Sequence, residues 1–323
     1  MRRLVLLTFA SLALIAGSVA WGQTYPNRPI RFVVGFSPGG TADVIARAVA
    51  AELQRQMGTN IVVDNRPGAG GVIANDIVAK AEPDGYTVLC ISSSFVAGVA
   101  IRTKLPFDPQ KDFAPITLFA TGVPNVLVVN PAFPGKSIQD LIALAKNKDK
   151  PVTYGSPGIG SVQHFVAELF NLRAGIRLVH VPYKGQAPAL NALLGGEIQV
   201  VFLQPPGGVD HIKAGKLRAL AFAGSSRWSG LPQVPTVAES GVPEFQLKGP
   251  FEGLLAPARI PREIVTKIHT GMRKALATPR LRKFFSVSGW EGDGRGPEEF
   301  RNFLNEELKR YAEIARAAKI RAE

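Results

Sequence analysis

The stretch Ile30-Arg31-Phe32-Val33-Val34-Gly35-Phe36-Ser37-Pro38-Gly39-Gly40-Thr41-Ala42-Asp43 joins a β-type run to an amphipathic helix through a glycine-rich turn. A second stretch, Val152-Thr153-Tyr154-Gly155-Ser156-Pro157-Gly158-Ile159-Gly160-Ser161-Val162-Gln163-His164, has the same design. The start of a helix after such a turn carries unpaired backbone N–H groups and the positive end of the helix dipole, which favour a small anion. We call residues 37–43 the first jaw and residues 156–164 the second jaw, and we expect them to bind one acidic ligand between them.

The rest of the chain alternates β-like runs with helical patterns, which predicts an α/β fold with largely parallel sheets. Apolar residues recur at helical spacing over residues 41–57, and Gly58 is placed to end that helix as a C-cap. Further strands are expected at residues 61–63, 86–91, 178–181, 198–203 and 217–221, and further helices are expected to open near Ser137, Ser161, Pro188, Pro261 and Pro297.

We expect two lobes, because roughly 300 residues after the first 20 exceed the usual size of one core. Two β-rich stretches, residues 113–130 and 248–256, are interpreted as crossings between the lobes. The first lobe then comprises residues 24–122 and 248–323, and the second comprises residues 123–247. Two crossing segments form a hinge, which is the architecture of a clamshell binding protein.

The N-terminus has the pattern of a secretory signal peptide. Arg2 and Arg3 precede an apolar run over residues 4–16, and small residues at 18–20 suit cleavage, so residues 1–20 are assigned to the signal. The run is shorter than the ~20 apolar residues of a membrane span. Cys90 is the only cysteine and lies in an apolar β-type run, so we expect a buried, inert thiol. A periplasmic protein without disulfides is the prediction.

Composition and motifs narrow the function classes. The formal charge is +13, but the basic residues are scattered, so we expect no nucleic-acid partner and a monomeric protein. No nucleophile–base pair stands out in the sequence, and the four histidines are spread without metal-ligand spacing. We therefore expect no catalysis, no metal and no cofactor.

The candidate site residues of the first jaw are Ser37, Gly39, Gly40, Thr41, Ala42 and Asp43. Adjacent glycines let a ligand approach the backbone closely, and a side chain at Gly40 is expected to block the anion and to strain the backbone. Asp43 lies in the first turn of the helix, where capping of neighbouring N–H groups is favoured over ligand contact. The glycine spacing does not match a nucleotide-binding fingerprint.

The candidates of the second jaw are Ser156, Gly160, Ser161 and His164. Ser161 is a good N-cap. His164 falls off the apolar stripe that Val162 and Phe165 begin, so its side chain is expected to face the cleft or solvent. Ligand contact and a capping or exposed histidine remain equal alternatives for it.

Three further candidates, Ser92, Tyr183 and Gln204, end predicted strands. Open α/β sheets bind ligands at the carboxyl ends of their strands. Binding and purely structural roles are both open for these three residues. The glycine loop at residues 67–71 also precedes a helix, and a structural role is favoured there.

The chain resembles the substrate-binding proteins of tripartite tricarboxylate transporters, the Bug family. The resemblance rests on the segments Tyr25-Pro26-Asn27-Arg28-Pro29-Ile30, Phe36-Ser37-Pro38-Gly39-Gly40-Thr41-Ala42-Asp43, Asn65-Arg66-Pro67-Gly68-Ala69-Gly70-Gly71, Pro83-Asp84-Gly85-Tyr86-Thr87, Asp112-Phe113-Ala114-Pro115-Ile116, His180-Val181-Pro182-Tyr183-Lys184-Gly185 and Pro235-Thr236-Val237-Ala238-Glu239. It implies a type II periplasmic-binding fold and a carboxylate bound by backbone amides and ordered waters at the two jaws. It also implies delivery of that acid to integral-membrane transporter subunits.

Three places depart from the family pattern. Phe251-Glu252-Gly253 stands where the family has Trp-aromatic-Gly, Leu203 stands where Asp or Asn is common, and Phe95-Val96-Ala97-Gly98 lacks the usual Asn-Pro. They leave the identity of the acid open. An alternative function is a periplasmic sensor subunit that presents its ligand to a receptor kinase, and a secreted enzyme on the same fold is a third reading.

Overall fold

Two β-sheets organise the computed structural model, which describes residues 25–243, 245 and 247–322. The six-stranded sheet has the order β11-β4-β10-β3-β1-β2. Its strands are β1 (Ile30–Val34), β2 (Ile61–Asn65), β3 (Thr87–Ser92), β4 (Phe113–Gly122), β10 (Phe251–Pro257) and β11 (Trp290–Arg295). We call this sheet and its helices the first lobe. The predicted signal peptide lies outside the described residues.

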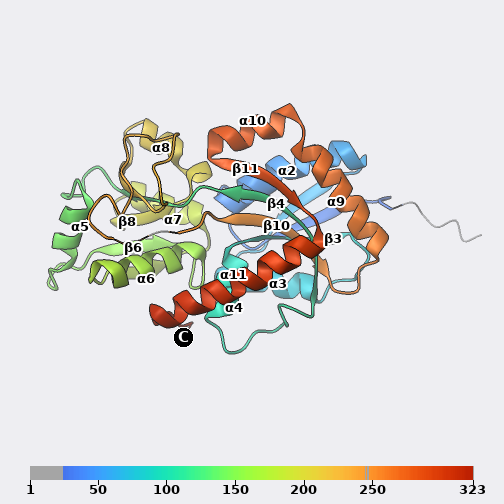
Figure 1. The fold of residues 1–323 in the computed structure, drawn as a ribbon, viewed down its shortest axis with the longest axis horizontal. Helices are drawn as coiled ribbons and strands as arrows, with labels where there is room; N and C mark the ends of the chain where they lie inside the picture. Colours follow the sequence, from blue (N-terminus) through green and yellow to red (C-terminus); the bar gives the residue numbers. More distant parts are fainter. Residues whose placement is uncertain (1–24, 244, 246, 323) are drawn as a thin grey trace, which may run out of the picture.

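The five-stranded sheet, with the order β7-β6-β8-β5-β9, and its helices form the second lobe (Figure 1). Its strands are β5 (Val126–Val129), β6 (Thr153–Ser156), β7 (Val179–Pro182), β8 (Val200–Leu203) and β9 (Arg218–Phe222). The predicted α/β fold with two lobes is confirmed.

The prediction of largely parallel sheets is wrong, because both sheets are mixed. β1 runs parallel to β2 and β3, and β6 runs parallel to β7 and β8. β10 is antiparallel to β3 and β4, β11 to β4, and β5 to β8 and β9. Every antiparallel pair includes β4, β5 or β10, the strands next to the crossings. β5 and β10 enter their sheets from the other lobe and run antiparallel to their neighbours.

The stretches interpreted as crossings are mostly strands. β4 ends at Gly122 and β5 begins at Val126, so only residues 123–125 pass between the sheets. The return passage reaches the first sheet at Phe251. The two passages run side by side, because Gly122 donates its N–H to the carbonyl of Pro250 at 2.8 Å. The predicted lobe boundaries fall in these passages and stay a prediction about where the protein bends.

The helices of the first lobe cover both faces of its sheet (Figure 1). α2 (Thr41–Met57), α9 (Arg262–Leu276) and α10 (Pro279–Ser288) pack on one face, and η1 (Ala69–Gly71), α3 (Val72–Ala79), α4 (Ser94–Ala100) and α11 (Pro297–Ala317) lie on the other. Side chains of β1 alternate between these layers, with Phe32 beside α2 and Val33 toward α3. α4, α10 and β11 were not expected from the sequence.

The second lobe repeats this arrangement on a smaller scale. α5 (Ile138–Ala145) and α6 (Val162–Ala174) pack on one face, and α7 (Gln186–Leu194) and α8 (Val209–Lys213), with η2 (Pro205–Gly207) before it, lie on the other. Val201 of β8 packs toward α7, whereas its neighbour Phe202 packs toward α6. α7 begins two residues before the predicted Pro188, so Gln186 is its first residue.

The predicted helix ends are confirmed where capping residues decide them. Gly58 ends α2 in the left-handed conformation with φ 65°. Ser137 opens α5 with a capping box that includes Asp140. Ser161 caps α6 by accepting the backbone N–H of His164.

The C-terminal helix α11 connects the two lobes. Phe300, near its start, packs under Gly253 of β10. Tyr311, further along, meets Phe165 of α6 edge to face with ring centroids 5.3 Å apart. Apolar residues of both sheets consequently belong to one continuous core. In Figure 1 the helix runs below the six-stranded sheet toward α6.

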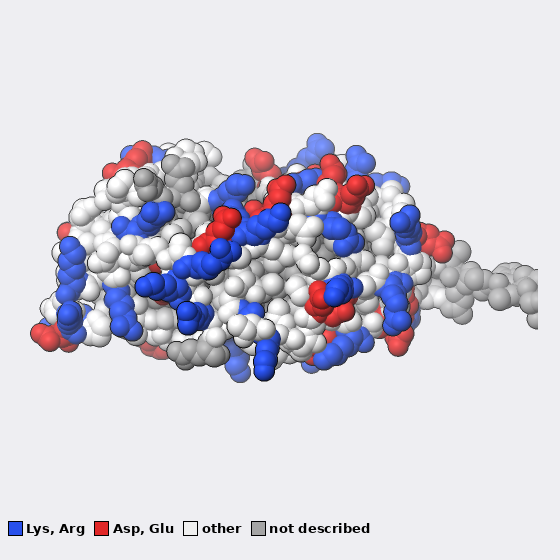
Figure 2. All heavy atoms as spheres, turned by 60° about the horizontal axis from the view of Figure 1, so that its bottom comes forward, with Lys and Arg blue, Asp and Glu red and all other residues white. Residues whose placement is uncertain are grey.

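The surface is charged but not uniformly basic. Figure 2 shows Lys and Arg spread over one face of the molecule with Asp and Glu between them. Across the described residues, we find no helix with the length and apolar composition that a bilayer span requires.

Candidate functional site

A small cavity lies where the two lobes meet at the carboxyl end of β3. It is lined by Phe36, Gly40, Thr41, Ala42, Ser92, Ser94, Pro157, Gln163, Gln186, Gln204 and Glu252. Its volume of about 20 Å³ corresponds to about one water molecule. As it stands, the cavity is smaller than an organic acid.

The first jaw presents the start of α2 to this cavity. Gly40, Thr41 and Ala42 line it, and their contact with a ligand stays a prediction. No side chain caps α2 at Gly40, so the first backbone N–H groups of the helix stay available to a ligand. Gly40 has φ −79°. The expected backbone strain from a side chain there is therefore wrong, because any residue adopts that angle.

Asp43 does not line the cavity, and its carboxylate stabilises the first jaw through hydrogen bonds and an ion pair. Its carboxylate accepts the N–H of Gly39 at 2.9 Å and the amide of Asn65 at 2.9 Å, and it pairs with Arg47 at 2.8 Å. Burial raises the pKa of Asp43, but these partners outweigh it and leave the pKa below its ordinary value. The structure agrees with the capping role favoured from the sequence.

Ser37 ties the first jaw to the second lobe. Its N–H and its hydroxyl both donate to the carbonyl of Lys184, at 3.1 and 2.7 Å. Lys184 precedes α7, and at the neighbouring Gly185 an added Cβ would lie 2.9 Å from the nitrogen of Ser37. The backbones therefore meet so closely that only glycine fits at this position.

The second jaw differs, because several of its N–H groups have partners within the protein. Gly158 donates to the Ser156 hydroxyl at 3.1 Å, and Gly160 donates to Nδ1 of His164 at 3.3 Å. His164 donates its own N–H to Ser161, and Val162 donates across the lobes to the hydroxyl of Ser94 at 3.1 Å. Of this jaw only Pro157 and Gln163 reach the cavity.

The prediction that His164 faces the cleft or solvent is wrong. Its ring is 7% exposed and stacks on His180 with centroids 4.4 Å apart. His180 stacks in turn on Tyr154 and lies 2.6 Å from the Ser156 hydroxyl through Nε2. Burial lowers the pKa of His164, and burial together with the neighbouring ring of His164 lowers the pKa of His180 to about 3. Burial therefore favours the neutral form of both rings, with His164 buried and His180 half-buried.

The remaining strand-end candidates divide. Ser92 and Gln204 line the cavity, whereas Tyr183 lies beside Gly155 and does not reach it. Ligand contact by Ser156, Gly160, Ser161, His164 and Tyr183 stays a prediction, with the geometry favouring a supporting role.

Gln186, the first residue of α7, takes the place expected for the second jaw. Its side-chain amide is paired with the backbone of Gln204 at 3.1 and 3.2 Å. The same Nε2 donates to the hydroxyl of Thr41 at 2.9 Å, which links the starts of α7 and α2 across the cavity. The signal in the sequence was Gly185 followed by Pro188, a combination typical of a helix start.

Glu252 is the second residue that the sequence analysis did not assign to the site. It lies on β10 opposite Ser92, is 1% exposed, and its Oε1 has no hydrogen-bond partner among the described residues. Burial raises the pKa of Glu252 well above its ordinary value. An acidic residue inside the apolar run of residues 251–257 was the available signal, since unpaired carboxylates are rarely buried.

The described cavity lining contains no lysine, arginine or histidine. A ligand anion would be bound by backbone N–H groups, hydroxyls and amides. In the described part of the chain no cluster of three His, Cys, Asp or Glu is arranged to ligate a metal ion. Cys90 is buried, as predicted, and burial raises its pKa, with a further contribution from Glu252.

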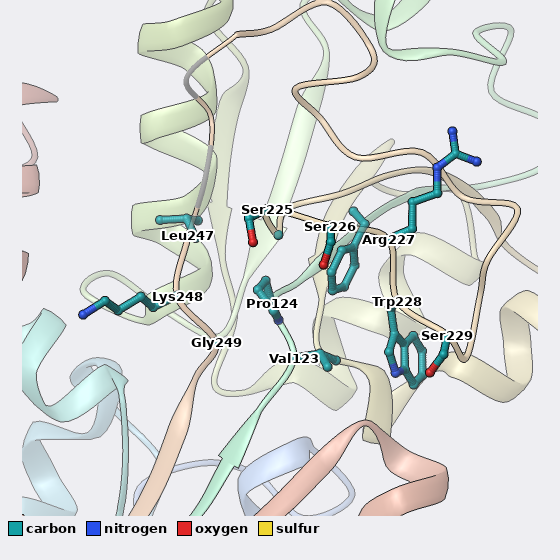
Figure 3. Close-up of a pocket in the computed structure, with 12 residues that line it drawn as sticks. Val123, Pro124, Ser225, Ser226, Arg227, Trp228, Ser229, Leu247, Lys248 and Gly249 are labelled. Carbon is teal, nitrogen blue, oxygen red and sulfur yellow. The ribbon is translucent and has the colours of Figure 1, made fainter.

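A much larger groove, about 670 Å³, lies beside the crossings and is lined by neither jaw. Figure 3 shows Pro124 and Val123 between Gly249 on one side and Trp228 on the other, while the cationic groups of Arg227 and Lys248 extend away from one another. Arg227 is also paired with Glu239 at 2.9 Å. Without converging charges or free helix starts, this groove is a weaker candidate for an anion than the cavity between the lobes.

Known proteins match both the sequence and the fold. Residues 45–320 match the model of the tripartite tricarboxylate transporter family receptors, TctC. BugT of Bordetella pertussis is 38% identical over 95% of this chain and 94% of its own. The solved structure of the periplasmic binding protein BugD superposes with a TM-score of 0.88 at 31% identity, covering 93% of this chain and all of that one. Rpa4515 of R. palustris, solved with adipate, gives 0.86 at 34% identity over 92% of this chain and 99% of that chain.

Proposed function

Since this chain belongs to the tripartite tricarboxylate transporter receptor family, we propose that it binds a small organic acid between its lobes and delivers it to a membrane transporter of that type. The observation that carries the proposal is the meeting of two helix starts at one cavity. Gly40 and Thr41 of α2 face Gln186 of α7 there, and donors at both starts favour a carboxylate.

The related proteins support the class of ligand. The structure of Rpa4515 contains adipate, a dicarboxylate. The cavity suits such a group because its lining supplies hydroxyl, amide and backbone donors, and hydrogen bonds to an anion are strong in a partly desolvated site. We infer that the carboxylate lies against the start of α2.

We place the protein in the periplasm. The apolar N-terminal run with its two preceding arginines supports export, and the family is one of receptors that serve membrane transporters. Cross-linking of the exported protein in its own membranes, followed by identification of the captured transporter subunits, tests the delivery step. Capture of a receptor kinase instead would favour the sensor alternative.

The binding step is tested by a thermal-shift screen over mono-, di- and tricarboxylates, followed by titration calorimetry of the hits. An acid that binds only the folded state raises the melting temperature by an amount that grows with the ratio of its free concentration to its Kd. We expect at least one small acid to bind without added metal. The absence of any stabilising carboxylate would contradict the proposal.

The same hits test whether the lobes close around the acid. We expect a smaller radius of gyration in small-angle scattering at saturating ligand, because an acid between the lobes draws the starts of α2 and α7 together. The ligand can shift this equilibrium only by its tighter binding to the closed form. An unchanged radius would argue against binding between the lobes.

A further inference from the structure

Glu252 is the one acidic side chain that lines the described cavity. It projects from β10, between Ser92 of β3 and Ala120 of β4, and it is 1% exposed. Its Oε1 is buried without a hydrogen-bond partner among the described residues. Buried polar atoms are almost always paired, so this oxygen needs an explanation.

The protein itself does not supply a partner for this charge. None of the described residues that line the cavity is a lysine, arginine or histidine. The titratable neighbour on the adjacent strand is Cys90, a buried thiol, which cannot supply a positive charge. A carboxyl group placed here is costly when ionised, unless a cation reaches it from the cavity.

The same cavity also contains the donors that favour a ligand carboxylate. Ala42 at the start of α2 and Glu252 both line it. A simple dicarboxylate bound there would bring negative charge to an unpaired acid. A ligand with an ammonium group beside its carboxylate would instead satisfy both, because it presents an anion to the helix start and a cation to Glu252.

We propose that Glu252 determines ligand specificity by pairing with a protonated nitrogen, so that the receptor prefers amino acids or similar zwitterions over plain carboxylates of the same length. This inference rests on the proposed function and adds the class of acid to it. Burial raises the pKa of Glu252, so we expect its carboxyl group to lose a proton when the ammonium binds.

The test is calorimetry with matched pairs of acids that differ only in one amino group, such as glutamate with glutarate and 4-aminobutyrate with butyrate. We expect the aminated member of at least one pair to bind about 10- to 100-fold more tightly, the range for a charge-assisted hydrogen bond. Repeating the titration in buffers of different ionisation enthalpy should show about one proton released per ligand.

The variant Glu252→Gln keeps the shape and removes the charge. We expect it to lose the preference for the aminated member, so that the two acids of a pair bind within a few-fold of each other. Glu307→Gln is the matched control, because Glu307 is also buried in the first lobe but pairs with Arg310 and does not line the cavity. The control should keep the preference.

Two outcomes would overturn the inference without touching the proposed function. One is tighter binding of the plain acid with no proton release, which would mean that a protonated Glu252 donates to a second carboxylate. The other is a preference for the aminated acid that survives in Glu252→Gln. Failure of every acid to bind would instead contradict the proposed function itself. The proton count is measured on the wild-type protein, so the inference stays testable even when the variant does not fold.

Discussion

The two jaws share a sequence design and differ in what their backbone N–H groups do. At the first jaw no side chain caps α2, and Gly40, Thr41 and Ala42 line the cavity. At the second jaw the hydroxyls of Ser156, Ser161 and Ser94 and the ring of His164 accept the N–H groups of Gly158, His164, Val162 and Gly160.

The difference shows that a glycine-rich turn before a helix is only a potential anion site. Whether it stays one depends on the capping side chains that follow. The Ser161 hydroxyl at the N-cap of α6 accepts the N–H of His164, and the His164 ring accepts the N–H of Gly160. The start of α7, which Gly185 precedes without a side-chain cap, faces the first jaw in its place.

The largest expected effect comes from filling the open jaw. Gly40→Val adds two methyl groups at a position where a Cβ alone already lies 3.5 Å from the nitrogen of Gln186. We expect an affinity loss of about 100-fold or more with little change in melting temperature, because φ at Gly40 suits any residue. Calorimetry with the best acid from the screen measures it, and Gly40→Ala should lose less than about tenfold. Unchanged affinity in Gly40→Val would remove the first jaw from the site.

A smaller effect is expected from separating the first jaw from α7. In Gly185→Ala the new Cβ would lie 2.9 Å from the nitrogen of Ser37, so the lobes cannot approach as closely. We expect about tenfold weaker binding and a larger radius of gyration with ligand. Gly196→Ala is the control, since Gly196 also has a positive φ but its Cβ would meet nothing within 4 Å. Equal affinities in the two variants would show that this contact does not limit closure.

Substitutions in the second jaw should lower the stability of the protein and leave its affinity for the acid nearly unchanged. Ser161→Ala removes the N-cap of α6, which we expect to cost about 1 kcal/mol of unfolding free energy, while affinity changes less than about twofold. Ser137→Ala at the cap of α5 provides a matched loss of stability far from the cavity. A tenfold loss of affinity confined to Ser161→Ala would restore the second jaw to the ligand contacts.

The smallest effect is a dependence of stability on pH. The pKa values of His164 and His180 are lowered in the folded protein, to about 3 for His180, while in the unfolded chain they stay near 6.5. Acidification below pH 6.5 therefore protonates the unfolded chain first, and stability falls by less than about 1 kcal/mol per ring between pH 7 and pH 6.

Urea unfolding at several pH values measures this effect. Glu252 contributes in the opposite sense, because its raised pKa makes the fold less stable as pH rises above about 4.5. The difference between wild type and His180→Gln isolates the histidine contribution, which should shrink in the variant. An identical pH profile in both proteins would show that His180 titrates normally.

Local signals in the sequence predicted the elements well. Gly58, Ser137 and Ser161 end or open helices where capping chemistry requires it, and the β-branched runs became strands. Local signals did not predict whether the strands beside the crossings run parallel or antiparallel to their neighbours. That direction depends on the lobe from which the chain enters the sheet. Residues 113–130 read as one β-rich stretch and belong to two sheets.

The site was predicted in part for a similar reason. The cavity residues of the first jaw follow from one short turn, and Ser92 and Gln204 follow from strand ends. The position of His164 depends on a partner ring 16 residues away, His180, and the position of Gln186 depends on Thr41 in the other lobe. Such long-range pairs leave no periodic trace in the chain. Glu252 could have been found from the sequence, because it is an acidic residue within an apolar strand.

The C-terminal helix α11 sets a limit on the freedom of the two lobes. If two strands were the only connection between the lobes, these strands alone would limit the relative movement of the lobes. Here a third support runs from Phe300 beneath β10 to Tyr311 against Phe165 of α6, directly after the second jaw. Any movement between the lobes must either slide that aromatic contact or pivot about it. We therefore expect the lobes to rotate about an axis near this contact, with the second jaw closest to it.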